Sequence, residues 1–333
     1  LRGARFVGID VGAETVKVVE LAREGDGLVW TRRRIVEHQK EPGPAVRAAL
    51  ADFGWDDLSG ASVVGRASRV LSLPSVPTKQ AQAAGSRFLV GDREATIVSI
   101  GAHGFSVLEL RASGVEVFRE NSRCSQGTGN FLRQLVERFG LDIETASEMA
   151  ERTTTPAVLS GRCPVILKTD MTHLANKGEP RERIVAGLFD AVCENVQVLI
   201  KPSVSPKDVL LIGGVARARR VHEHFGKFAQ RHGMNLLETA ADDHLYADAI
   251  GAALVAAERP SRVPTLDRLL APAHHAHLDR LPALASQLSS VNRMTRPALP
   301  TEFGERREVI VGVDIGSTGS KAVAVDRQRR EVV

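Results

Sequence analysis

A repeated pattern of strand, glycine turn and strand constrains the fold of this chain most strongly. Residues 7–19 and 311–323 match position by position, with the same order of apolar residues, aspartate, glycine and lysine. The identical positions in the first copy include Gly8, Asp10, Gly12 and Lys17. Two apolar runs around a short turn predict a β-hairpin. The self-similarity indicates two copies of one structural unit.

The opening hairpin argues against two common nucleotide-binding folds. P-loop and Rossmann folds need a helix directly after the glycine turn. Here residues 16–22 are typical of a returning strand, and residues 28–38 of a third strand. The order of strand, glycine turn and strand recurs at residues 95–111, and helical patterns follow from residue 129. Together these segments predict an α/β fold.

Composition narrows the classes of function. The chain has 333 residues and is 43% hydrophobic, which suits roughly two globular domains. The net charge of +4 is spread along the chain and aromatic residues make up 4%, so we expect no nucleic-acid partner. We find no apolar run of about 18 residues and no signal peptide, so no membrane partner is expected either. Three cysteines make no disulfide framework and fit a reducing cytoplasm, the expected location.

The motif Asp10-x-Gly12-x-x-x-x-Lys17 has the chemistry of a phosphate site. Backbone N–H groups of the turn can surround a terminal phosphate, a carboxylate at a strand end can hold Mg²⁺ through water, and a lysine can neutralise phosphate charge. For a single copy, an ordinary hairpin turn is the better interpretation. Two copies, each followed by a returning strand, favour the phosphate site.

The segment from Cys124 to Leu132 combines a thiol with a Gly-Thr-Gly turn at the expected start of a helix. N–H groups at such a start can bind a phosphate or ribose. The cysteine is a soft metal ligand or a redox thiol. Cys163 also precedes an expected helix, whereas Cys193 lies mid-helix and is expected in the core. The alternative is that Cys124 and Cys163 are buried structural thiols.

These hairpins, the Cys124 segment, Cys163 and a later strand leading into Gly213-Gly214-Val215-Ala216 resemble the actin/Hsp70/sugar-kinase ATPase superfamily. Within it, the chain looks like the ATP-dependent activases of 2-hydroxyacyl-CoA dehydratases and the ATPase subunits of benzoyl-CoA reductases. The resemblance covers about residues 5–257. It implies an actin-like ATPase fold, in which two ribonuclease-H-like lobes clasp ATP in a cleft.

The resemblance also implies cofactors, site residues and partners. The cofactors are ATP or ADP, Mg²⁺ and a [4Fe–4S] cluster shared across a dimer or pseudodimer, with Cys124 and Cys163 as this chain's two ligands. The residues expected at the phosphates and Mg²⁺ are Asp10, Gly12, Thr15, Lys17 and Gly101. Those expected on the nucleoside side are Gly127, Thr128, Gly129, Gly213 and Gly214. The expected partner is an acyl-CoA dehydratase or reductase that receives a low-potential electron, and the domain is expected to pair with itself or with the second copy.

Four positions depart from the family pattern. The family's second hairpin usually reads Asp-Ile-Gly-Gly-Gln-Asp, whereas Ser99 and Gly104 replace the two aspartates here. His103 replaces the glutamine that is expected to position the attacking water. Glu14 lies in the first turn, where hydroxyl residues are usual, and would bring a negative charge near the phosphates. These departures leave two alternatives open: a regulatory or scaffold domain that binds nucleotide and cluster without catalysis, and a sugar kinase, which would give the cysteines no role.

The expected domain organisation follows from the repeat. Residues 1–257 form an actin-like ATPase domain, with lobe I at about 1–122 plus 240–257 and lobe II at about 123–239. Residues 258–307, which contain prolines and histidines, form a linker. Residues 308–333 form the first hairpin of a second ATPase-like domain, from which we infer that the protein continues past Val333.

Overall fold

The computed structural model describes residues 3–120, 129–159, 164–271, 284–292, 294–295, 307–316 and 319–333. The chain divides into two compact units, Leu1–Ala273 and His274–Val333. Across the described residues, none of the helices has the length and apolar character needed to cross a membrane.

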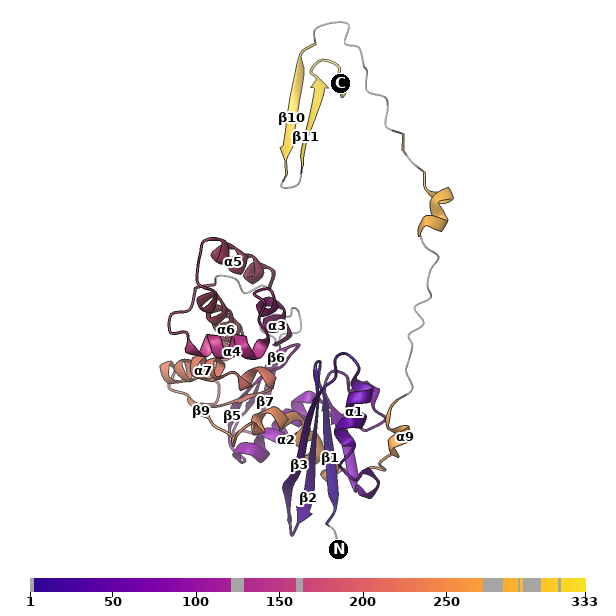
Figure 1. Ribbon diagram of the computed structural model, residues 1–333, viewed down its shortest axis with the longest axis vertical. Helices are drawn as coiled ribbons and strands as arrows, with labels where there is room; N and C mark the ends of the chain where they lie inside the picture. The colour runs from indigo at the N-terminus through magenta and orange to yellow at the C-terminus, as the bar shows by residue number, and fades with distance from the viewer. Residues whose placement is uncertain are drawn as a thin grey trace. The chain divides into compact units, whose positions relative to one another are not determined.

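The first sheet of the larger unit is built around the opening hairpin. Its strands are β1 (Arg5–Val11), β2 (Thr15–Glu24), β3 (Gly27–Glu37) and β4 (Gly60–Val64), in the order β3-β2-β1-β4 (Figure 1). β1 pairs antiparallel with β2 and parallel with β4. Residues 6–11 of β1 are all buried, which explains why its apolar run does not alternate with polar residues.

Helices cover both faces of this sheet. On one face, Val7 and Ile9 of β1 cluster with Val46 of α1 (Pro42–Leu50). On the other face, Leu21 of β2 clusters with Ile250 of α8 (Ala247–Glu258), a helix that also packs against α2 (Thr78–Val90). Burial on both faces therefore brings a late segment of the chain, α8, against its first two strands.

Glycines allow α8 to approach its neighbours closely. A Cβ atom on Gly8 of β1 would lie 1.9 Å from the carbonyl oxygen of Ala249. A Cβ atom on Gly251 of α8 would lie 1.9 Å from the carbonyl oxygen of Ala81 in α2. These positions have no room for a side chain. The close packing of α8 therefore requires the alanine and glycine residues on its face.

The second sheet repeats the topology of the first. Its strands are β5 (Ala95–Ile100), β6 (Phe105–Leu110), β7 (Glu116–Glu120), β8 (Asp208–Ile212) and β9 (Asn235–Leu237), in the order β7-β6-β5-β8-β9. As in the first sheet, an antiparallel meander, β5-β6-β7, is extended by a parallel strand, β8, beside the first strand of the meander. The repeated topology fits the expected pair of similar lobes.

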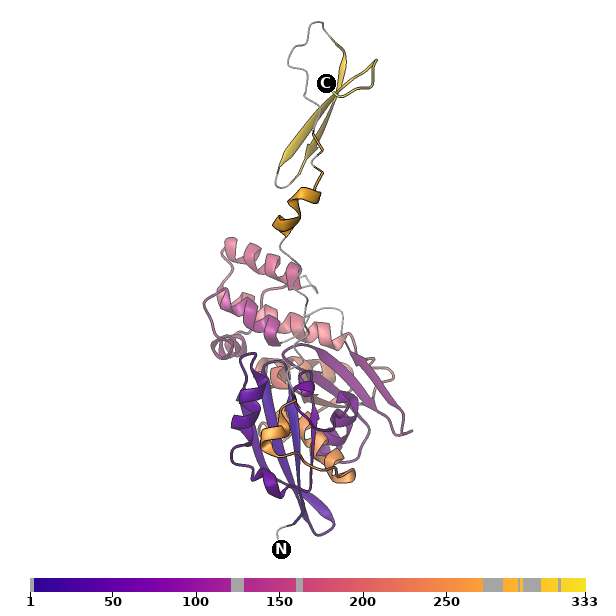
Figure 2. The same ribbon diagram turned by 90° about the vertical axis from the view of Figure 1, so that its right-hand side faces the viewer.

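Helices inserted between β7 and β9 pack on the second sheet and form with it the largest apolar cluster among the described residues. They are α3 (Gly129–Glu137), α4 (Ile143–Arg152), α5 (Pro164–Asn176), α6 (Arg181–Gln197) and α7 (Arg219–Arg231). Figure 2 shows α3 to α6, in magenta to pink, gathered together. Asp142 caps the start of α4, because Thr145 N donates to Asp142 Oδ1 at 2.6 Å.

A buried arginine joins three of these helices. Arg220 of α7 donates to both carboxylate oxygens of Asp190 in α6, at 2.8 and 2.7 Å. Its remaining N–H group donates to the carbonyl oxygens of Ala150 and Thr153, each at 2.7 Å, at the end of α4. The planar guanidinium therefore donates to both oxygens of the Asp190 carboxylate and also to the free carbonyl groups at the end of α4.

A buried carboxylate anchors the second sheet at β6. Glu109 accepts hydrogen bonds from Arg111 at 2.6 Å, from Ser205 at 2.7 Å and from Arg119. Burial alone would raise the pKa of Glu109, but these hydrogen bonds outweigh it, so the pKa lies below its ordinary value. Glu109 is therefore a charged core residue whose partners keep it ionised.

Two predicted boundaries differ from the structure. The strands of residues 95–120 pair with β8, so the second sheet begins well before the lobe boundary expected at about residue 122. The first part of the expected linker packs on the larger unit: Trp55 Nε1 donates to the carbonyl oxygen of Pro264 at 2.7 Å, and Leu269 of α9 (Leu266–Leu269) is fully buried. Proline content alone did not distinguish this packed segment from a free linker.

The smaller unit contains the second copy of the hairpin. Its strands are β10 (Val309–Ile315) and β11 (Ser320–Asp326), preceded along the chain by a 3₁₀ helix, Leu284–Ser290. Asp314 lies opposite Lys321, the register in which Asp10 lies opposite Lys17. The apolar side chains of β10 are exposed, whereas those at the matching positions of β1 are buried. The repeat therefore extends from sequence to strand register.

Candidate nucleotide site

An ion pair lies at the end of the first hairpin. Asp10 and Lys17 are opposite each other on β1 and β2, and Lys17 Nζ lies 2.8 Å from Asp10 Oδ2. Both side chains are about nine-tenths buried. Burial lowers the pKa of Lys17, but the Asp10 carboxylate more than offsets this, so the pKa lies above its ordinary value. The motif thus places a protonated lysine and a carboxylate beside the glycine turn.

Backbone geometry fixes the turn beside this pair. Gly12 N donates to the carbonyl oxygen of Thr15 at 3.0 Å, and the His38 ring lies 3.2 Å from the carbonyl oxygen of Gly12. Gly65, after β4, has φ +102°, and a Cβ atom there would lie 2.5 Å from Asp10 Oδ1. Gly65 is a site residue that the sequence analysis missed. A glycine directly after a predicted strand was its visible signal.

Glu14 has cationic partners on both sides of the turn. Lys40 forms an ion pair with its carboxylate, and Arg133 of α3 lies 3.8 Å from it and 3.6 Å from Glu37. The negative charge expected to disfavour phosphates is therefore largely balanced within the chain. Through Arg133, the first hairpin also connects to α3, whose start lies at the second hairpin.

The second glycine turn, the start of α3 and the glycines after β8 converge. Gly129 N donates to the carbonyl oxygen of Gly101 at 2.9 Å, and a Cβ atom on Gly129 would lie 2.9 Å from the Val215 side chain. Gly213 has φ +92°, and a Cβ atom there would lie 2.7 Å from the carbonyl oxygen of Ile100. Gly214 begins the 3₁₀ helix Gly214–Arg217. Four of the predicted nucleotide-binding glycines thus lie together around one turn.

The other predicted site residues have different positions. His103, proposed to position a water, is exposed at the tip of the second hairpin. Cys124, Gly127, Thr128 and Cys163 lie outside the described residues. Cys193 is buried in α6, as expected for a core residue, and burial raises the pKa of its thiol. Within the described part of the chain, no group of three or more His, Cys, Asp or Glu side chains could hold a metal ion.

Asp248 is a second carboxylate near the Asp10–Lys17 pair, and the sequence analysis missed it. It lies in the first turn of α8, beside the Gln82 side chain of α2, which lowers its pKa. Its Oδ1 atom is buried and has no hydrogen-bond partner among the described residues. Burial and the charge of Asp10 raise the pKa of Asp248 to about 7, against the lowering effects of Lys17 and Gln82. This contact joins residues far apart in sequence and has no local signal.

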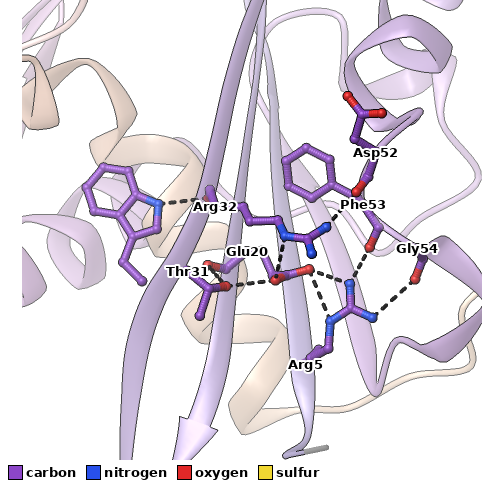
Figure 3. A network of polar contacts seen from close by, with 8 residues as sticks. Arg5, Glu20, Thr31, Arg32, Asp52, Phe53 and Gly54 are labelled. Atoms are coloured by element: carbon purple, nitrogen blue, oxygen red, sulfur yellow. Dashed lines mark hydrogen bonds and ion pairs between the residues drawn. The ribbon is translucent and has the colours of Figure 1, made fainter.

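A separate cavity of about 580 Å³ opens at the opposite end of β1 and β2. Figure 3 shows the polar network at this cavity. Glu20 lies on its wall and accepts hydrogen bonds from Arg5 at 2.5 Å and from Thr31 at 2.7 Å, and Arg32 lies 3.8 Å from it. Arg5 also donates to the carbonyl oxygen of Gly54 at 3.3 Å. Because these groups satisfy one another and lie away from the glycine turns, we interpret the network as structural.

Comparison with known proteins identifies the family. A model of the BadF/BadG/BcrA/BcrD ATPase family matches residues 7–256. The chain belongs to this family. The matched range coincides with β1 to α8, so the family match covers both sheets and all three glycine segments.

Named relatives of this family member align over nearly their whole length. The chain is 27% identical over 276 residues to one of the benzoyl-CoA reductase subunits of Thauera aromatica, covering 78% of this chain and 95% of that protein. It is 24% identical over 265 residues to the (R)-2-hydroxyglutaryl-CoA dehydratase activating ATPase of Acidaminococcus fermentans, covering 77% and 98%. The resemblance inferred from the motifs is therefore confirmed.

Two solved structures share the fold. The crystal structure of component A of the Acidaminococcus fermentans (R)-2-hydroxyglutaryl-CoA dehydratase gives a TM-score of 0.67 at 22% identity, covering 76% of this chain and 97% of that one. The activator of the 2-hydroxyisocaproyl-CoA dehydratase from Clostridium difficile, solved with bound ADPNP, gives 0.66 at 22% identity, covering 76% and 94%. The expected actin-like ATPase fold is confirmed.

Proposed function

We infer that this family member is an ATP-dependent activator that passes a low-potential electron from a [4Fe–4S] cluster to an acyl-CoA dehydratase or reductase. The observation that carries the proposal is the connection between the two glycine hairpins. Glu14 of the first turn meets Arg133 of α3, and the start of α3 is hydrogen-bonded to Gly101 of the second turn. The names of the aligned relatives, an activating ATPase and a reductase component, support the same function.

In this proposal, the hairpins bind the nucleotide. Lys17 neutralises phosphate charge, N–H groups around Gly12, Thr15 and Gly101 bind phosphate oxygens, and Asp10 holds Mg²⁺ through water. Mg²⁺ fits here because carboxylate oxygens suit it and because Asp248 Oδ1 has no partner among the described residues. When bound, Mg²⁺ offsets the charge that develops on the transferred phosphoryl group. The residues on the nucleoside side are Gly127, Thr128, Gly129, Gly213 and Gly214.

The cluster would be held by Cys124 and Cys163. Along the chain these residues precede α3, which begins at Gly129, and α5, which begins at Pro164. Two thiolates per chain supply half of a four-cysteine ligand set, so the other half comes from a second copy of the domain. That copy is either another chain or the repeat that begins with β10 and β11. A ligand just before a helix moves when the helix moves, so α3 and its Arg133 contact with Glu14 would couple the turn to the cluster.

The full chain, purified without oxygen, tests the proposal. We expect about one [4Fe–4S] cluster per pair of domains, measured by iron content and by electron paramagnetic resonance after reduction, together with ATP hydrolysis. Cys124→Ser and Cys163→Ser should lose the iron, whereas Cys193→Ala, a change at a buried cysteine of α6, should keep it. A Cys124→Ser protein that retains its full iron content would refute the ligand assignment.

A second candidate function follows from the second hairpin. Ser99 and Gly104 replace the family's aspartates, and the exposed His103 replaces its glutamine. These changes favour a domain that binds nucleotide and cluster but does not hydrolyse ATP. Nucleotide binding without measurable turnover by a chain that contains iron would support this regulatory function over the activator. Turnover would exclude it.

A further inference from the structure

The region around the first hairpin has more negative charge than its own pairs balance. Asp10 and Lys17 form a buried ion pair at 2.8 Å, which leaves Asp248 as an additional carboxylate near both. Its Oδ1 atom is buried without a partner among the described residues. An unsatisfied buried polar atom costs about 1–3 kcal/mol, and more when the group is charged. A ligand that binds to such a group removes this cost, or a function of the group compensates for it.

A chain of side chains extends from Asp248 toward the second hairpin. The Gln82 side chain lies beside Asp248 and lowers its pKa, and Ser106 Oγ donates to Gln82 Oε1 at 3.5 Å. Ser106 of β6 lies opposite Ser99 of β5, the position at which this chain lacks the aspartate of the family pattern. Asp248 is therefore connected to both hairpins: directly to the Asp10–Lys17 pair of the first, and through Gln82 to the strand pair that ends in the second.

The chemistry of the missing partner follows from the charges. Another carboxylate or a phosphate would be repelled by Asp10 and Asp248 together. A divalent cation that keeps most of its water suits two carboxylates held by different elements, because Mg²⁺ is usually bound by one or two carboxylates, water and substrate phosphates. Because Gly65 has no side chain, it leaves the Asp10 Oδ1 atom uncovered. A Cβ atom at residue 65 would lie 2.5 Å from this oxygen.

We propose that Asp248 is the second carboxylate for the divalent cation that accompanies the nucleotide, and that it replaces the acid absent at Ser99. The inference rests on the proposed binding of nucleotide between the two hairpins. Asp248 acts on the cation from α8, a helix that packs against β1, β2 and α2, so the cation would connect the elements that carry the two hairpins. In this role Asp248 is a binding residue for the cation.

Binding of ADP to the full chain, with Mg²⁺ and with excess EDTA, measures the cation's contribution. Mg²⁺ should tighten ADP binding to the unmodified chain. In Asp248→Asn, the ratio of the dissociation constant in EDTA to the dissociation constant in Mg²⁺ should fall about tenfold, which corresponds to about 1.4 kcal/mol. The affinity for ADP in EDTA should be unchanged or higher. The substitution keeps the side-chain shape and one of its oxygens and removes the charge. Asp248→Ala should show the same loss if the asparagine protein folds poorly.

Glu182→Gln is the matched control, because Glu182 is an exposed acid in the first turn of α6 and faces no charged site. It should leave both dissociation constants unchanged. An Asp248→Asn chain that keeps the full Mg²⁺ dependence overturns the inference but not the proposed function. The inference is also overturned, but not the proposed function, if Mg²⁺ does not change the binding of ADP to the unmodified chain. Absence of ADP binding by the unmodified chain refutes both the inference and the proposed function.

Discussion

Replacing Gly251 of α8 with alanine tests the packing on which the candidate site depends. The new Cβ atom would lie 1.9 Å from the carbonyl oxygen of Ala81 and 2.5 Å from its carbonyl carbon. Both are backbone atoms of α2, so no flexible side chain can move aside. The matched substitution is Gly226→Ala in α7, where no described atom lies within 4 Å of the position that the new methyl carbon would take.

The size of the effect follows from these distances. A carbon–oxygen contact normally lies at about 3.3 Å or beyond, so α2 and α8 must separate by about 1.4 Å. Overpacking of this kind costs about 1–3 kcal/mol, and the upper part of that range applies because backbone must move. In a helix interior, alanine is otherwise better than glycine by about 0.5–1 kcal/mol. Both variants gain this helix preference, so it cancels, and the Gly226→Ala protein should be about 2–3 kcal/mol more stable than the Gly251→Ala protein.

Urea unfolding followed by circular dichroism measures the difference. At this chain length it corresponds to roughly 3–5 °C in melting temperature. Separation of α8 from α2 also draws Asp248 away from Gln82, so Gly251→Ala should weaken Mg²⁺-dependent ADP binding, whereas Gly226→Ala should not. Equal stability of the two proteins would refute the close approach of α8 and α2.

Three further substitutions test the polar contacts. Glu109→Gln should lower the free energy of unfolding by about 2–3 kcal/mol at pH 7. The folded-state pKa of Glu109 lies below 4.5, so the charged carboxylate stabilises the fold above that pH and this stabilisation is lost as the pH falls. The difference in unfolding free energy between the two proteins, measured by urea unfolding, should therefore shrink toward pH 3. Arg220→Lys keeps the charge but loses the two-oxygen contact with Asp190, and should cost about 2–4 kcal/mol in the same assay. Glu14→Ser removes a carboxylate from the first turn and should tighten ADP binding about fivefold, or about 1 kcal/mol, in a titration without Mg²⁺; unchanged binding would contradict the placement of phosphates at this turn.

Local patterns predicted the hairpins well. The two apolar runs and the glycine turn between them predicted the hairpin of β1 and β2, whose register places Asp10 opposite Lys17. The same logic predicted the second glycine turn at Gly101 and the repeat at β10 and β11. These features depend on residues close together in sequence, so the sequence pattern contains them.

Features that depend on distant contacts were missed. α2 has few large apolar residues, and its buried face consists of small or polar side chains such as Ala81, Gln82 and Gly85, so no apolar periodicity marks it. The lobe boundary was misplaced because nothing in residues 95–120 shows that they pair with β8. Asp248 lies near Asp10 because α8 packs on β1, which no local pattern reveals.

The close fit of α8 to β1 has a consequence for synthesis of the chain. β1 emerges from the ribosome well before α8, which follows more than two hundred residues later; at 5–20 residues per second the interval is roughly 10–50 s. Until then the Gly8 face of the sheet has no cover, and an unfinished sheet of this kind is open to misassembly. The repeated hairpin β10–β11 offers α8 a similar surface, but it is made after α8. The order of synthesis therefore lets α8 dock on its own sheet before the competing copy exists.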